Sequence, residues 1–135
     1  MTTSPPETLV VDASALVEAL LGTPFGSMVR ARTRGCVLVA PAHIDAEVLS
    51  ALGRLNRAGE LTDELAGTAV ANLATAPIRR HQLAGVLEGA WQRRERLRLA
   101  DALYVELAGS LGAALVTTDA RLSRADDRVE LIAAA

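Results

Sequence analysis

The stretch LVVDASAL, Leu9 to Leu16, decides the fold. Three apolar residues typical of a buried strand lead directly into Asp12, and the small and apolar residues that follow favour a helix. A carboxylate at such a junction loses much of its hydration, which is costly unless a cation or hydrogen-bond donors compensate. The stretch therefore predicts a strand–helix unit with a charged group at its turn, and it raises the question of what keeps a charge there.

Further apolar and periodic segments extend this pattern along the chain. Buried strands are predicted at CVLVA (Cys36–Ala40), ALVTTD (Ala114–Asp119) and VELIA (Val129–Ala133), with a short strand or connector at Pro77–His81. Helices are predicted at Ser14–Leu21, Gly26–Arg34, Ala42–Arg57, Leu61–Ala74, Leu83–Arg96 and Ala100–Leu111. Strands that alternate with helices indicate an α/β fold, with a mainly parallel sheet covered by helices on both faces.

The bulk composition limits the class of protein. A chain of 135 residues is long enough for one domain, expected at residues 8–135, whereas MTTSPPE (residues 1–7) is expected to be a flexible lead-in. A net charge of −2 argues against a broad cationic surface for nucleic acid. Cys36 is the one cysteine, so a disulfide framework is excluded, and no apolar run reaches membrane-spanning length. We expect a cytoplasmic protein with no membrane association.

Acidic residues stand where two of the predicted strands end. Asp12 follows the first strand and Asp119 closes ALVTTD. In open α/β sheets the ligand site lies beyond the carboxyl ends of the strands, and right-handed crossovers bring these ends to one edge. Asp101 adds a third acid, in the first turn of a predicted helix and on its apolar arc. Each of the three could instead serve only as a helix cap or turn former.

The segment PAHIDAEVLSAL adds a fourth acidic position. Asp45 and Glu47 flank the apolar face of its predicted helix on opposite edges, so the periodicity does not choose between them. Buried like charges raise one another's pKa unless a cation neutralises them, and Mg²⁺ or Mn²⁺ accepts oxygen ligands of this kind. Such an ion can activate water and stabilise the charge that develops during phosphodiester cleavage. A shared metal would therefore explain why Asp12 tolerates its position.

Four segments in order carry a family resemblance: VVDASAL, PAHIDAEVLSAL, RLADALYVELAG and LVTTDARL. They resemble the successive acidic motifs of PIN-domain ribonucleases, and most of all the VapC toxins of bacterial VapBC toxin–antitoxin pairs. The resemblance spans Leu9 to about Ile132. It implies a three-layer α/β/α PIN-like domain that cleaves RNA with Mg²⁺ or Mn²⁺, binds a VapB-type antitoxin and forms a homodimer.

The resemblance also assigns roles to residues. It selects Glu47 over Asp45, because the family's glutamate precedes a Val-Leu-x-Ala-Leu run. The implied catalytic residues are Asp12, Glu47, Asp101 and Asp119, with Asp12, Asp101 and Asp119 as metal ligands and Ser14 and Thr118 as supporting residues. We expect few basic residues near this pocket, so that an arginine of the antitoxin could block it by pairing with the carboxylates.

Two further questions concern RNA contacts and competing functions. In RRERLR, the candidates for contacts with an RNA backbone are Arg93, Arg94, Arg96 and Arg98, although arginines on a helix are commonly just solvated.

Two other classes of α/β protein with acids at strand ends are excluded. A receiver domain needs a lysine near its acids, and all 14 Lys and Arg residues of this chain are arginine. A haloacid-dehalogenase-type phosphatase needs Asp-x-Asp after its first strand, and this chain has Asp-Ala-Ser. A catalytically inactive PIN-like binding module stays open as the alternative; metal-dependent cleavage lost in Asp12→Asn would exclude it.

Overall fold

The computed structural model describes residues 4–133. Residues 1–3 of the predicted lead-in therefore lie outside the described part, and the last residue of the lead-in is held by the domain. The Glu7 carbonyl accepts a hydrogen bond from the Val37 N–H at 2.8 Å, and its carboxylate pairs with Arg32 at 2.9 Å. The contacts of the domain thus include Glu7, one residue before the first strand.

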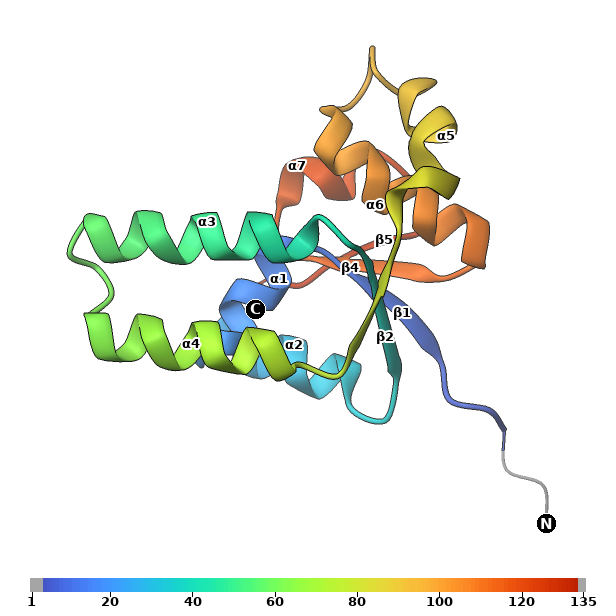
Figure 1. Cartoon of the computed structure of the whole chain (residues 1–135). Coiled ribbons are helices and arrows are strands. Elements are labelled where there is room, and N and C mark those ends of the chain that lie inside the picture. The colour runs from blue at the N-terminus through green and yellow to red at the C-terminus, as the bar shows by residue number, and fades with distance from the viewer. Residues whose placement is uncertain (1–3, 134–135) are drawn as a thin grey trace.

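A five-stranded, fully parallel sheet forms the centre of the fold (Figure 1). Its strands are β1 (Thr8–Val11), β2 (Val37–Pro41), β3 (Ile78–His81), β4 (Ala114–Thr117) and β5 (Val129–Leu131). The spatial order is β3-β2-β1-β4-β5, so β1 is central and the direction of strand addition reverses between β1 and β4. The prediction of a parallel sheet is confirmed, and β2 continues through Pro41, where it was expected to stop.

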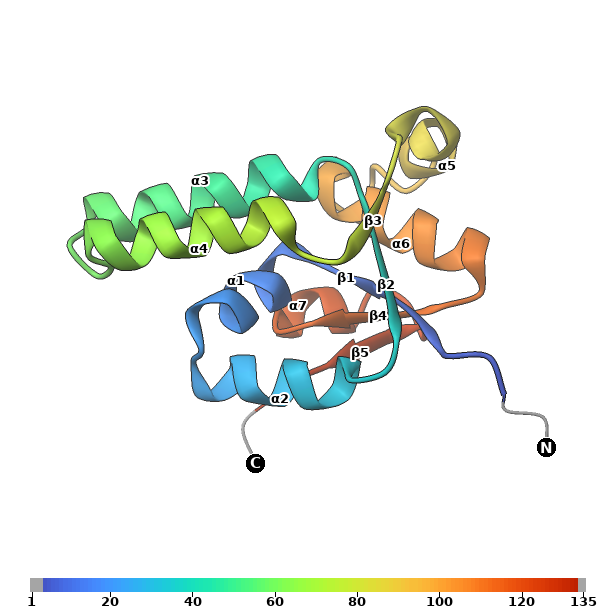
Figure 2. The ribbon, with the colours of Figure 1, turned by 60° about the horizontal axis from the view of Figure 1, so that its bottom comes forward.

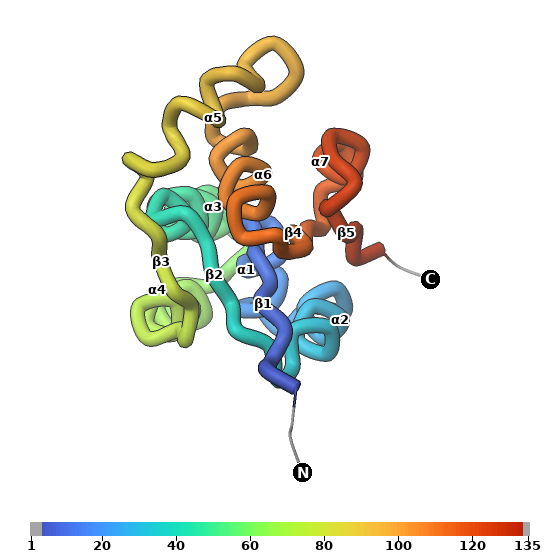
Figure 3. Tube along the Cα trace, turned by 90° about the vertical axis from the view of Figure 1, so that its right-hand side faces the viewer, coloured from blue at the N-terminus to red at the C-terminus, as the bar shows by residue number. Residues whose placement is uncertain are grey.

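Helices cover both faces of this sheet. They are α1 (Ala13–Leu21), α2 (Pro24–Thr33), α3 (Ile44–Arg57), α4 (Asp63–Thr75), the 3₁₀ turn η1 (Leu83–Val86), α5 (Leu87–Trp91), α6 (Leu99–Leu111) and α7 (Ala120–Ser123). Helices α1 to α4 pack on one another, whereas α6 lies across β1, β2 and β4 and carries α5 (Figures 2 and 3). Right-handed crossovers place these two groups on opposite faces. The three-layer α/β/α class is confirmed.

The prediction of one helix over Leu83–Arg96 is wrong. The segment forms η1, the short helix α5 and a series of turns. Gly85 and Gly89 weaken helical continuity, because glycine loses the most backbone freedom in a helix. A Cβ at Gly89 would overlap the Glu106 side chain, so this glycine permits the close approach of α5 to α6. The turns after α5 are tied to α6 by an ion pair between Arg93 and Glu106 at 3.2 Å.

Strand β1 runs through the densest part of the core. Leu9 and Val10 have no exposed surface and Val11 has 1%. Helix α3 contributes Ile44, Val48 and Leu52 to the same core, and α6 contributes Tyr104, Val105, Leu107 and Ala108. This packing fixes the carboxyl end of β1 against the first turns of α3 and α6. Within residues 4–133, no helix is long and apolar enough to cross a membrane.

Candidate active site

All four predicted acids line one polar pocket at the carboxyl edge of the sheet. The pocket has a volume of about 330 Å³. Asp12 follows β1, Asp119 follows β4, and Glu47 and Asp101 lie in the first turns of α3 and α6. The pocket therefore lies over β1 and β4, where the order of the strands reverses, which is the usual ligand position in open α/β sheets.

Asp12 is the buried acid of the pocket, with 5% of its surface exposed. The pKa of its carboxyl group is raised to about 6, mainly by burial and to a lesser degree by the nearby charge of Asp119. Three hydrogen bonds act in the opposite direction: Oδ1 accepts from the Ser14 hydroxyl at 2.8 Å and from the Ala15 N–H at 3.0 Å, and Oδ2 accepts from the Thr117 hydroxyl at 2.5 Å. Asp12 is thus both the cap of α1 and a pocket acid with incomplete charge compensation.

A small hydroxyl network supports Asp12. The Ser14 and Thr117 hydroxyl oxygens lie 3.2 Å apart, and Thr117 is fully buried. Thr118, the predicted supporting residue, lines the pocket and donates its backbone N–H to Ser14 at 3.1 Å. The hydroxyl that contacts the acid therefore belongs to the preceding threonine. Thr117 also accepts the Asp119 N–H at 3.0 Å, so it links the two strand-end acids.

Glu47 and Asp45 have separate environments. The Glu47 carboxylate accepts a hydrogen bond from the Tyr104 hydroxyl at 2.6 Å and lies 3.4 Å from His43 Nε2. Asp45 does not line the pocket; it forms an ion pair with Arg80 at 3.0 Å. The same arginine donates to backbone carbonyls at the end of α4 and the start of β3. The geometry therefore agrees with the selection of Glu47 for the pocket.

Asp101 and Asp119 share one arginine. Arg121 Nη2 lies 3.0 Å from Oδ2 of each carboxylate, and Arg98 Nε lies 3.2 Å from Asp101 Oδ2. Partial burial opposes the ionisation of Asp119, but the hydrogen bonds from Arg121 outweigh it and hold its pKa below the ordinary value. Because Arg54 and Arg98 also line the pocket, the expectation of few nearby basic residues is wrong.

A hard divalent cation fits the donor chemistry of this pocket. Its four carboxylates offer the oxygen ligands that Mg²⁺ and Mn²⁺ prefer, and the buried Asp12 carboxylate lacks a cationic partner among residues 4–133. Within these residues no three acidic, histidine or cysteine side chains are already gathered at ligand spacing. Arg121 instead lies between Asp101 and Asp119, with its side chain half-exposed. An ion at this position would therefore replace an internal counterion.

The four arginines proposed to contact RNA have different neighbours, although Arg93 and Arg96 line one hollow together. Arg98 lines the acidic pocket, and Arg96 lines a neighbouring hollow that also includes Asp101 and Arg121. Arg93 is paired with Glu106, and Arg94 lies over the Trp91 ring at 4.7 Å from its centroid. Only Arg96 and Arg98 are therefore near the acids.

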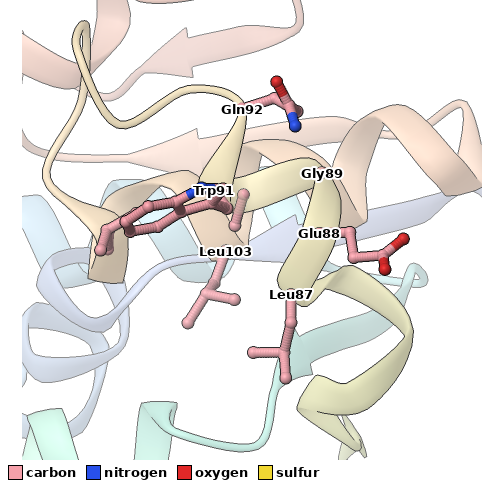
Figure 4. Close-up of a pocket in the computed structure, with 8 residues that line it drawn as sticks. Leu87, Glu88, Gly89, Trp91, Gln92 and Leu103 are labelled. Carbon is pink, nitrogen blue, oxygen red and sulfur yellow. The ribbon is translucent and has the colours of Figure 1, made fainter.

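A larger, apolar hollow lies away from the acids. It has a volume of about 850 Å³ and lies between α5 and α6. Figure 4 shows Leu87, Trp91 and Leu103 around it, with Glu88 and Gln92 at its margin. None of the four predicted acids lines this hollow. Its surface lacks convergent polar groups for chemistry, so the smaller polar pocket is the candidate active site.

Three residues of the site escaped the sequence reasoning: Thr117, Tyr104 and Arg121. Strand alternation could have indicated that Thr117 points to the same side as Leu115, because these two residues lie on one face of β4 and the intervening residue lies on the other. Tyr104 follows Asp101 by three residues, which places both on one side of α6. No local pattern distinguishes Arg121 from the other arginines, because its role depends on the approach of α6 to α7.

The comparisons with known proteins agree with this geometry. The PIN domain family matches residues 9–128. The chain is 56% identical to Ribonuclease VapC3 of Mycobacterium tuberculosis over 91% of this chain and 90% of that protein. It is similar in structure to PAE2754 from Pyrobaculum aerophilum (TM-score 0.67, 26% identity, 93% and 83% of the two chains). A toxin–antitoxin complex from Klebsiella pneumoniae has the same fold (TM-score 0.67, 12% identity, 93% and 98% of the two chains). This chain belongs to the PIN-domain family and, within it, to the VapC ribonucleases.

Proposed function

We propose that this protein is a metal-dependent endoribonuclease and the toxin of a type II toxin–antitoxin pair. The family supports the reaction class, since the relative with 56% identity is a ribonuclease. The observation that carries the proposal is the convergence of Asp12, Glu47, Asp101 and Asp119 in one pocket, from four different elements of the chain. A site kept only for binding would not require a buried carboxylate whose ionisation is opposed by its surroundings.

Asp12, Asp101 and Asp119 would hold Mg²⁺ or Mn²⁺. When bound, such an ion supplies Lewis-acid stabilisation of a phosphate and lowers the pKa of water. Asp12 is the best-oriented ligand, because Ser14, Ala15 and Thr117 fix both of its oxygens. Asp101 and Asp119 become available when Arg121 moves away.

The remaining pocket residues act on RNA. Glu47 faces the pocket as a carboxylate that can accept a proton from, or orient, an attacking water. The Arg98 side chain is 70% exposed at the pocket rim, and it can bind a phosphate of the substrate. Arg121 is also suited to this contact once released from the two aspartates. Arg96 is next to these residues, whereas Arg93 and Arg94 have other partners.

A VapB-type antitoxin is the proposed partner and RNA the proposed substrate. An arginine of the antitoxin would meet Arg121 already in place, so it would either displace Arg121 or pair with Asp12 and Glu47. We also propose a homodimer, a cytoplasmic location, and a single nuclease domain at residues 8–135 after the lead-in of residues 1–7. Light scattering of the purified toxin, alone and with its antitoxin, would test the assembly.

The test of the function is RNA cleavage by the purified chain with Mg²⁺, with Mn²⁺ and with EDTA. We expect cleavage only with a divalent ion, and its loss in Asp12→Asn and Asp101→Asn. Asp127→Asn is the matched control, because Asp127 is an exposed acid outside the pocket. RNA binding without cleavage under every metal condition would support an inactive binding module and contradict the proposal.

A further inference from the structure

We propose that Tyr104 is a positioning residue whose hydroxyl group sets the direction of the Glu47 carboxylate in the pocket. This inference rests on the proposed function, because it takes the Glu47 carboxylate as a group that acts on the attacking water. The ring of Tyr104 belongs to the core and its hydroxyl group to the pocket. The two parts of the side chain therefore have different tasks, which substitution can separate.

The contact between Tyr104 and Glu47 is short and largely enclosed. Tyr104 is 1% exposed, and its hydroxyl donates to Glu47 Oε1 at 2.6 Å. Burial, followed by the hydrogen bond to Glu47, raises the pKa of Tyr104 above its ordinary value. The hydroxyl therefore keeps its proton and stays a donor near neutral pH.

His43 lies near the same carboxylate oxygen. Its ring lies against the Tyr104 ring, with 4.8 Å between centroids. Nε2 lies 3.0 Å from the Ala100 carbonyl, to which it donates, and 3.4 Å from Glu47 Oε1. Both contacts of the glutamate thus fall on Oε1. The other oxygen, Oε2, is left for a water or ligand in the pocket.

Helix α6 links this contact to the rest of the site. Asp101 and Tyr104 are three residues apart and lie on one side of the helix, and both line the pocket. Glu47 lies on a different helix, α3, and a third of its side chain is exposed. Without a donor from α6, the long glutamate side chain is free to turn toward solvent or toward Arg54, which lines the same pocket. The Tyr104 hydroxyl therefore fixes the position of Glu47 relative to Asp101 before substrate arrives.

Tyr104→Phe tests this role because it removes the hydroxyl and keeps the ring. We expect kcat for RNA cleavage at saturating Mg²⁺ to fall about 10- to 100-fold, the usual effect of losing a group that orients a catalytic-site ligand, with KM for RNA unchanged. Ser110→Ala is the matched control: it removes a hydroxyl from the same helix that donates only to the Leu107 carbonyl, away from the pocket. Its kcat should equal that of the parent.

A double-mutant cycle connects the effect to Glu47. The free energy of unfolding is measured with urea in EDTA for four proteins: the parent, Tyr104→Phe, Glu47→Gln and the double variant. We expect the two positions to be coupled, so that Tyr104→Phe changes this free energy less in the Glu47→Gln background than in the parent. A parental kcat in Tyr104→Phe, or additive stabilities in the cycle, would overturn the inference. If Glu47→Gln itself kept full cleavage, the catalytic role of Glu47 would be wrong and the inference would fail with it. Loss of cleavage in Glu47→Gln with full cleavage in Tyr104→Phe would overturn the inference alone.

Discussion

The charge on Asp12 should make the metal-free protein less stable than a neutral variant. Burial raises the pKa of Asp12 from 3.8 to about 6, and at about 1.4 kcal/mol per pKa unit the ionised carboxylate is about 3 kcal/mol less favourable in the folded chain than in the unfolded one. Asp12→Asn removes this cost. Its Oδ1 can still accept from Ser14 and Ala15, and its amide nitrogen can donate to the Thr117 hydroxyl, which accepts in place of donating.

The sign of the pH dependence follows from the raised pKa. The folded state binds the Asp12 proton more tightly than the unfolded state, so this group favours folding below pH 3.8, and the contribution is lost as pH rises through about 6. We therefore expect Asp12→Asn to gain about 2–3 kcal/mol over the parent near neutral pH in EDTA, and to lose that advantage near pH 4.

Urea unfolding at both pH values measures the difference, with the midpoints compared at equal slope. The gain should coincide with the loss of RNA cleavage, as expected for an acid whose negative charge serves chemistry and destabilises the fold. A variant that is less stable than the parent near neutral pH would refute the reasoning. The same stability difference at both pH values would also refute it, because the effect would not come from ionisation.

Three further predictions concern the other charged groups of the site. Mn²⁺ should raise the melting temperature of the parent but not that of Asp101→Asn, by preferential binding to the folded state; equal shifts would contradict a ligand role for this acid. Asp45→Asn should retain most of the cleavage activity, because Asp45 pairs with Arg80 outside the pocket. Loss of cleavage in this variant would contradict the assignment of Glu47 as the catalytic residue of this helix. Arg121→Gln should bind Mn²⁺ several-fold more tightly than the parent in calorimetry, because the arginine no longer competes for the two aspartates. Arg124→Gln is the control, because Arg124 makes no ion pair among residues 4–133, and equal affinities of all three proteins would show that Arg121 does not compete with the metal.

The sequence predicted the elements whose signals are local. Leu9 to Val11 read as a buried strand because every residue is apolar, and the aspartate after it marked the end of that strand. The long helix α3 followed from its spacing of Ile44, Val48 and Leu52, all of which are buried. The family resemblance then selected the glutamate that the periodicity could not.

The features that escaped prediction depend on contacts between distant elements. Apolar residues recur from Leu83 to Trp91 and predict a helix, but Gly89 brings α5 against Glu106 and the helix is interrupted. The basic side chains near the acids come from α3, from the residue before α6 and from α7, so no segment of sequence reveals a cationic cluster. Asp45 and Glu47 differ because Arg80 comes from β3, 35 residues away. Charge compensation is a property of the assembled fold.

The position of β1 at the centre of the sheet also determines when the site can exist during synthesis. Asp12 is made before the other acids of the site, but the hydroxyl that holds its Oδ2 belongs to Thr117, 105 residues later. A growing chain that has not yet reached β4 has β1 with one open edge, and it lacks both Thr117 and Asp119. Closing so long a loop comes late in the assembly of such a sheet. A ribosome that synthesises this nuclease is therefore not exposed to a working active site until almost the whole domain has emerged, by which time a partner protein in the same cell can already be present to bind it.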